Sequence, residues 1–208
     1  MACDLAAVLA DAPAPVGAGA ALATAPGLVG APANLVFALR GAGSSDFWQY
    51  NIAQNAWTVM PSTPEPVGDG AALVEVASCG GNSLFEIAAL RGGGTSDFWC
   101  FDIAHSVWVT GPGIPPVPAA TGPGVSLAQL QRFGYIYALR GGGTSDFWQL
   151  KSGTWKQLSD TPDPVNAGGA LVGINYGTQS HSAVLMRWKE GVLVRFGSTT
   201  SPRTHGRT

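Results

Sequence analysis

The chain has 208 residues, a length that suits one large domain or two small ones with a sizeable core. Only 12% of the residues are charged and the net charge is −2, so the sequence lacks the basic face of a general nucleic-acid-binding protein. Glycine and proline are abundant, at 29 and 15 residues, but seven tryptophans and a hydrophobic content of 46% argue against a disordered chain.

The first ten residues do not resemble a signal peptide, because they lack a basic start and Asp4 interrupts their apolar run. No later stretch approaches about 18 uninterrupted apolar residues, so we expect no membrane-spanning helix. These features favour a cytoplasmic location, with secretion of a chain whose leader is missing as the alternative.

The three cysteines, Cys3, Cys79 and Cys100, show no metal-ligand spacing. We interpret them as small core or surface residues, with a disulfide or a reactive thiol as the alternative. We accordingly predict no metal site and no cofactor.

An internal repeat dominates the sequence and is the strongest indication of its fold. A block of eleven residues occurs three times, and its arginines are 51 and 49 residues apart. A proline-marked segment lies near the start of each unit, and a second tryptophan follows each block. We predict a single domain over residues 1–197, with units at about 12–60, 61–111, 112–160 and 161–197, and a tail at 198–208. The three blocks are Ala38–Trp48, Ala89–Trp99 and Ala138–Trp148, and the second tryptophans are Trp57, Trp108 and Trp155.

Each unit is predicted to form four short β-strands. Runs of small, β-branched and aromatic residues separated by Gly, Asn and Ser clusters are typical of β-hairpins. Apolar side chains occupy both faces of the third strand, so each sheet must be covered on both sides, as in radially stacked blades. In the second unit the expected strands are Ala71–Ala77, Leu84–Arg91, Asp97–Ile103 and Val107–Thr110.

These units resemble the kelch repeat, in which an apolar strand ends in a glycine pair and is followed by an aromatic residue and, six residues later, a tryptophan. Gly92-Gly93, Phe101 and Trp108 fit this pattern, whereas the third unit has Leu150 in place of the aromatic residue and a shorter interval. The resemblance covers about residues 12–175. It implies an all-β propeller that binds other proteins or, in some members, handles sugars. Four units imply a four-bladed ring.

The fourth unit is degenerate and is predicted to lack an outer strand. It contains a strand at His181–Arg187, a turn at Trp188–Gly191 and a strand at Val192–Phe196. Register with the second unit predicts that residues 5–9 supply the missing strand and close the ring, which leaves no open edge. A frayed N-terminal tail is the alternative. We expect a monomer or a homodimer that completes the ring.

The repeated charges are the main candidate site. An arginine ends the second strand of each unit and an aspartate opens the third, so the two should face each other across a hairpin. One interpretation is an ion pair that fixes the turn and joins neighbouring blades. The other is a clamp for a ligand, with the block tryptophan stacking on a sugar ring. The candidates are Arg40, Asp46 and Trp48, then Arg91, Asp97 and Trp99, and finally Arg140, Asp146 and Trp148.

Other patterns favour structure over chemistry. The glycine-rich turns lack the lysine and helix of a phosphate-binding loop, so we assign them to positive-φ turn geometry. The second tryptophans should pack between blades, and Trp188 should be exposed. His105, His181 and His205 fall in unrelated places, and no catalytic constellation is readable, so we predict that the protein is not an enzyme.

The predicted function is therefore a binding scaffold. Alternating strand directions place the loops between second and third strands and the proline-rich connectors at one end of the ring, where binding residues are usually carried. We expect a protein partner, with a multivalent carbohydrate-binding module and a purely structural unit as alternatives.

Overall fold

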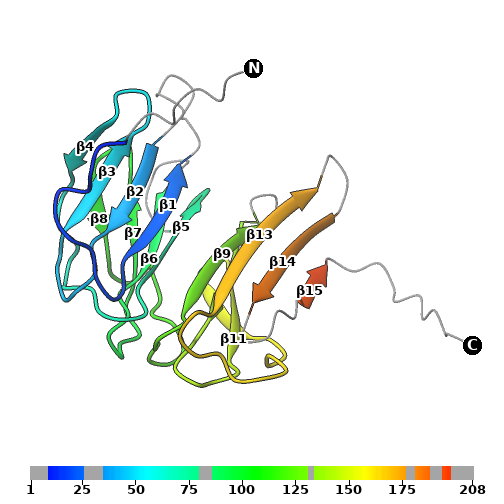
Figure 1. The fold of residues 1–208 in the computed structure, drawn as a ribbon. Helices are drawn as coiled ribbons and strands as arrows, with labels where there is room; N and C mark the ends of the chain where they lie inside the picture. The colour runs from blue at the N-terminus through cyan, green and yellow to red at the C-terminus, as the bar shows by residue number, and fades with distance from the viewer. Residues whose placement is uncertain are drawn as a thin grey trace, which may run out of the picture.

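The computed structural model describes residues 9–25, 35–79, 86–130, 134–176, 181–187 and 194–197. Within these ranges all regular structure is β-strand, and no helix occurs. The strands form four antiparallel sheets that follow one another in chain order (Figure 1). An all-β fold built from repeated antiparallel sheets is thereby confirmed.

In the described part of the chain three sheets have four strands each, and the fourth sheet has three. Every observed strand of the second sheet lies inside its predicted range. The first sheet contains β1 (Ala21–Ala25), β2 (Leu35–Leu39), β3 (Phe47–Asn51) and β4 (Ala56–Val59); the second contains β5 (Ala72–Val76), β6 (Glu86–Leu90), β7 (Phe98–Asp102) and β8 (Val107–Val109). The third contains β9 (Ser126–Leu130), β10 (Tyr135–Leu139), β11 (Phe147–Lys151) and β12 (Thr154–Gln157), and the fourth contains β13 (Ala170–Tyr176), β14 (His181–Arg187) and β15 (Val194–Gly197).

The first strand of each sheet is the innermost. β1 lies against β5, β5 against β9, and β9 against β13. Among the described residues strands pair only within their own sheet, and the predicted closure of the ring is not confirmed. Residues 5–8 of the expected closing strand, the turn at 188–191 and the tail at 198–208 lie outside the described residues.

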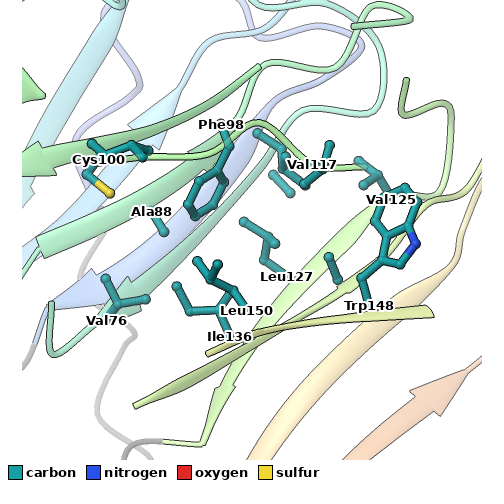
Figure 2. Close-up of a cluster of buried hydrophobic side chains, with 14 residues drawn as sticks. Val76, Ala88, Phe98, Cys100, Val117, Val125, Leu127, Ile136, Trp148 and Leu150 are labelled. Carbon is teal, nitrogen blue, oxygen red and sulfur yellow. The ribbon is translucent and has the colours of Figure 1, made fainter. Parts of the chain in front are cut away.

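The core lies between neighbouring sheets. β6 and β7 are buried along their whole length, because the second sheet is covered on both of its faces. Figure 2 shows the layer between the second and third sheets, where Phe98 and Ala88 face Ile136 and Leu150. The layer between the first and second sheets is aromatic, with the rings of Phe47 and Phe101 at 4.9 Å. Burial on both faces confirms the prediction made from the apolar pattern of the third strand.

Two of the three second tryptophans join neighbouring sheets, as predicted, whereas the Trp57 ring packs on Trp48 and Tyr50 of its own sheet. The Trp108 ring of the second sheet lies 4.9 Å from the Phe47 ring of the first. The Trp155 ring of the third sheet lies 5.4 Å from the Phe98 ring of the second. Each indole N–H also donates to a backbone carbonyl of the preceding connector, Trp108 to Pro61 at 3.0 Å. The indole therefore combines apolar packing with a satisfied polar atom.

The cysteine interpretation is wrong at two positions, because Cys79 and Cys100 form a disulfide. Cys79 follows β5 and Cys100 lies in β7, and both of these strands pair with β6. Their Cα atoms are 6.0 Å apart, although 21 residues separate them in the sequence. Their proximity depends on how the strands pair, which spacing along the chain does not reveal.

Candidate functional site

The repeated arginines and aspartates form ion pairs across their hairpins, as the sequence predicted. In each pair the arginine Nη1 donates to the aspartate Oδ2, and the backbone N–H of the arginine donates to the aspartate carbonyl. The three pairs are Arg40–Asp46 at 2.9 Å, Arg91–Asp97 at 2.9 Å and Arg140–Asp146 at 2.7 Å.

Each arginine also holds the connector that precedes its own sheet. The Nε of Arg91 donates to the carbonyl of Pro66 at 3.0 Å, and the carbonyl of Arg91 accepts from the N–H of Gly68 at 3.0 Å. The Nε atoms of Arg40 and Arg140 donate in the same way to Pro15 and Ala120, both at 2.9 Å. The planar guanidinium can serve two acceptors at once. The pairs therefore have a structural role in fixing both hairpin and connector.

The glycine-rich turns lie against the connectors, which places both at one end of the sheets. Gly92 has a φ of +70°, and a Cβ there would lie 2.4 Å from the backbone N of Ala71, so only glycine fits. The turn then meets the following connector, where the N–H of Thr121 donates to Thr95 at 2.8 Å. The Thr95 hydroxyl donates to Gly92 at 2.8 Å and is thus used within the turn.

The charged side chains of this end are about one third exposed. The arginine side chains are 26–32% accessible and the aspartates 31–42%. The hydrogen bonds from Arg40 and from Ser44 lower the pKa of Asp46 below its ordinary value of 3.8. In the described part of the chain, no group bonds the Nη2 of Arg40 or Arg140. The Nη2 of Arg91 lies 3.9 Å from a Glu65 oxygen. We call the three arginines and three aspartates the charged rim.

The block tryptophans are not part of this rim. Trp48, Trp99 and Trp148 are only 3%, 6% and 2% exposed. Trp99 and Trp148 belong to the buried clusters between sheets, and the Trp48 ring packs against Trp57. The indole N–H of Trp148 is bonded to the side chain of Gln157. The structure therefore offers no open indole face for the predicted stacking on a sugar at these three positions.

A histidine–aspartate pair, missed by the sequence reading, lies in the turn between β7 and β8. Asp102 accepts from the backbone N–H of His105 at 3.1 Å and contacts its Nδ1 at 2.9 Å. Among the described residues no hydroxyl or thiol is bonded to His105, whose side chain is 65% exposed. An aspartate side chain that accepts a backbone N–H from a residue shortly after it in the sequence is typical of a turn. An aspartate at the start of a turn is therefore the feature of the sequence that could have indicated this pair.

A hollow of about 590 Å³ lies along the innermost strands. It is lined mainly by apolar side chains with a few polar groups, and it is open to solvent. No sequence motif indicates this hollow, because its walls come from four separate sheets. The lining includes Leu22 of β1, Val74 of β5, Gln129 of β9 and Val172 of β13.

Comparisons with known proteins reveal a similarity in fold alone. No protein-family model and no curated protein match the chain. Its structure is similar to that of YjhT, with a TM-score of 0.58, 14% identity, and coverage of 93% of this chain and 69% of that one. It is also similar to a variant of AofleA from Arthrobotrys oligospora with three arginines changed to alanine (TM-score 0.53, 16% identity, 86% of this chain and 56% of that one). No described helix has the length and apolar character needed to cross a membrane.

Proposed function

We propose that the protein is a non-enzymatic binding module with a kelch-like propeller architecture, and that its charged rim binds a segment of a partner protein. The repeated sheets, with their inner strands side by side, support this architecture. The observation that carries the binding proposal is the presence of three equivalent, part-exposed ion pairs at one end of the sheets. Loops held on a rigid scaffold are suited to recognition.

Ring closure by residues 5–9 belongs to the same proposal, and one repeated contact supports it. The Trp108 indole donates to the carbonyl of Pro61, which follows β4 of the preceding sheet. The Trp57 indole donates to the carbonyl of Ala10 at 3.0 Å, across the same sequence separation of 47 residues. Ala10 thus occupies the position of a residue that follows an outer strand, and the fourth sheet is the one for which only three strands are described.

The chemistry of the rim suits a peptide backbone. Each pair presents a guanidinium edge beside a carboxylate, which is a donor next to an acceptor. A peptide group offers the complementary carbonyl and N–H. A sugar also offers both, but sugar sites gain much of their affinity from an open aromatic face, and the block tryptophans are buried. A protein segment is therefore the favoured partner, and a glycan is the second candidate.

The test is to pan a random-peptide phage library against the whole protein and to measure the selected peptides by calorimetry. The informative variant is Asp46→Asn/Asp97→Asn/Asp146→Asn, which removes the carboxylates but leaves the side-chain volumes. Loss of charge-assisted hydrogen bonds of about 1.5–3 kcal/mol each predicts at least about tenfold weaker binding. Lys156→Gln on the exposed face of β12 is the matched control and should bind unchanged.

Circular dichroism of the triple variant establishes that it is folded. Peptides that bind the triple variant as tightly as the natural chain would refute the rim as the site. A glycan array run in parallel distinguishes the second candidate, because sugar binding without any peptide binding would replace the partner class. If neither a peptide nor a glycan binds, the binding proposal is refuted and the ion pairs have a structural role alone.

A further inference from the structure

The second sheet contains a buried carboxylate with one oxygen that no residue in the described part of the chain hydrogen-bonds. Glu86 at the start of β6 is 0% exposed. Its Oε2 accepts the N–H of Cys79, but among the described residues its Oε1 has no hydrogen-bond partner. An ionised carboxylate that is removed from water without a cation or a full set of donors is costly. This position is therefore one that a cation would stabilise.

The neighbours of Glu86 supply two further ligand atoms. The sulfurs of Cys79 and Cys100 and a carboxylate oxygen of Glu86 all lie within 4.8 Å of one another. Asp102, which is 3% exposed, is the cross-strand partner of Glu86 and makes the region more negative. Asp102 has His105 as a partner, whereas no basic side chain is paired with Glu86 in the described part of the chain.

The disulfide of the oxidised protein hides this ligand set. Figure 2 shows the sulfur of Cys100 at the margin of the core between the second and third sheets. A cavity of about 330 Å³ reaches Cys79 and is lined also by Ser78, Ile136 and Ser152. A small ion, a water molecule or a reductant thus has a route to Cys79.

We propose that Cys79, Glu86 and Cys100 form a redox-gated site for a thiophilic divalent cation such as Zn²⁺. A dithiol reductant delivers two electrons and two protons, the S–S bond breaks, and the reductant leaves as its own disulfide. The cation then displaces one proton from each thiol and forms two S–metal bonds and one bond to Glu86 Oε1. Two thiolates and one carboxylate suit Zn²⁺, and an open fourth position takes a water molecule.

The distances are compatible with such a site. Tetrahedral zinc with sulfur at about 2.3 Å and oxygen at about 2.0–2.2 Å keeps its ligand atoms roughly 3.4–3.8 Å apart. The observed set falls within 4.8 Å, so side-chain rotation about the opened disulfide is sufficient.

The experiment uses the whole chain with Cys3→Ser as background, so that only the two paired cysteines remain. The protein is reduced with a phosphine, desalted without oxygen and titrated with Co²⁺ alone, while an oxidised sample is titrated in parallel. The reduced protein should take up one equivalent, with thiolate-to-cobalt charge-transfer absorption and the intense visible bands of tetrahedral cobalt. Addition of Zn²⁺ should displace the cobalt, and the oxidised sample should give neither signal.

Two variants separate the site from adventitious binding. Glu86→Gln removes one direct ligand and should weaken Co²⁺ binding by more than the roughly 10–100-fold typical of outer-sphere changes. Glu65→Gln, a carboxylate 61% exposed in a connector, is the matched control and should leave binding unchanged. Equal affinity of Glu86→Gln and the natural chain, absence of charge-transfer absorption, or loss of the β-sheet circular dichroism on reduction would each overturn the proposal.

Discussion

The Arg91–Asp97 pair offers a direct measurement of how much the charged rim contributes to stability. The two side chains meet at 2.9 Å, but they are 26% and 41% exposed, so water screens their attraction. Part-exposed pairs of this kind contribute about 0.5–1 kcal/mol. Asp97→Asn should therefore lower the free energy of unfolding by about that amount.

Arg91→Ala should cost more, because Arg91 has a second function. Its Nε donates to the carbonyl of Pro66 at 3.0 Å and so anchors the connector. Loss of this hydrogen bond adds about 1 kcal/mol to the loss of the ion pair. The expected total is about 1.5–2 kcal/mol, or a decrease in Tm of roughly 3–8 °C for a chain of this size.

A double-mutant cycle in urea, followed by tryptophan fluorescence, isolates the pair from these other effects. The coupling energy between Arg91 and Asp97 should be about 0.5–1 kcal/mol at low ionic strength and should shrink in about 1 M salt. Glu65→Gln, whose oxygen is 3.9 Å from Arg91, is the control and should change stability by less than about 0.5 kcal/mol. Strictly additive single substitutions would refute the stabilising ion pair.

Three further predictions concern the repeated framework. Trp108→Phe keeps the packing between sheets but loses the 3.0 Å bond to Pro61, so calorimetry should show a loss of about 1 kcal/mol, and an unchanged Tm would argue against that bond. Ala42 has a φ of 56° where the other copies of the turn have glycine, so Ala42→Gly should raise stability by about 0.5–1 kcal/mol in urea unfolding; destabilisation would contradict the strain. Because hydrogen bonds from Arg40 and Ser44 lower the pKa of Asp46 in the folded state, its stabilising effect is complete at neutral pH and is lost only as the pH falls below 3.8 and through the folded pKa. Natural and Asp46→Asn proteins should therefore differ in stability by a constant amount down to about pH 4 and converge in stronger acid, and convergence already near pH 6 would exclude this assignment.

The sequence by itself determined the features that depend on short stretches of chain. The repeated blocks predicted each strand of the second sheet, because strand and turn preferences act over a few residues. They also predicted the Arg91–Asp97 pair, since a five-residue turn leaves its two ends opposite each other. The assignment of the glycine-rich turns to positive-φ geometry also depends on a few adjacent residues only, and the structure confirms it.

Only the tertiary structure decided the features in which distant segments meet. The disulfide between Cys79 and Cys100 depends on two strands that share a neighbour, and the burial of Glu86 depends on a sheet covered from both sides. Trp99 is buried although its sequence surroundings equally allow an exposed ring. Burial depends on which surfaces pack together in the folded protein. The sequence shows which residues are apolar enough to be buried, but it does not show which residues pack against them.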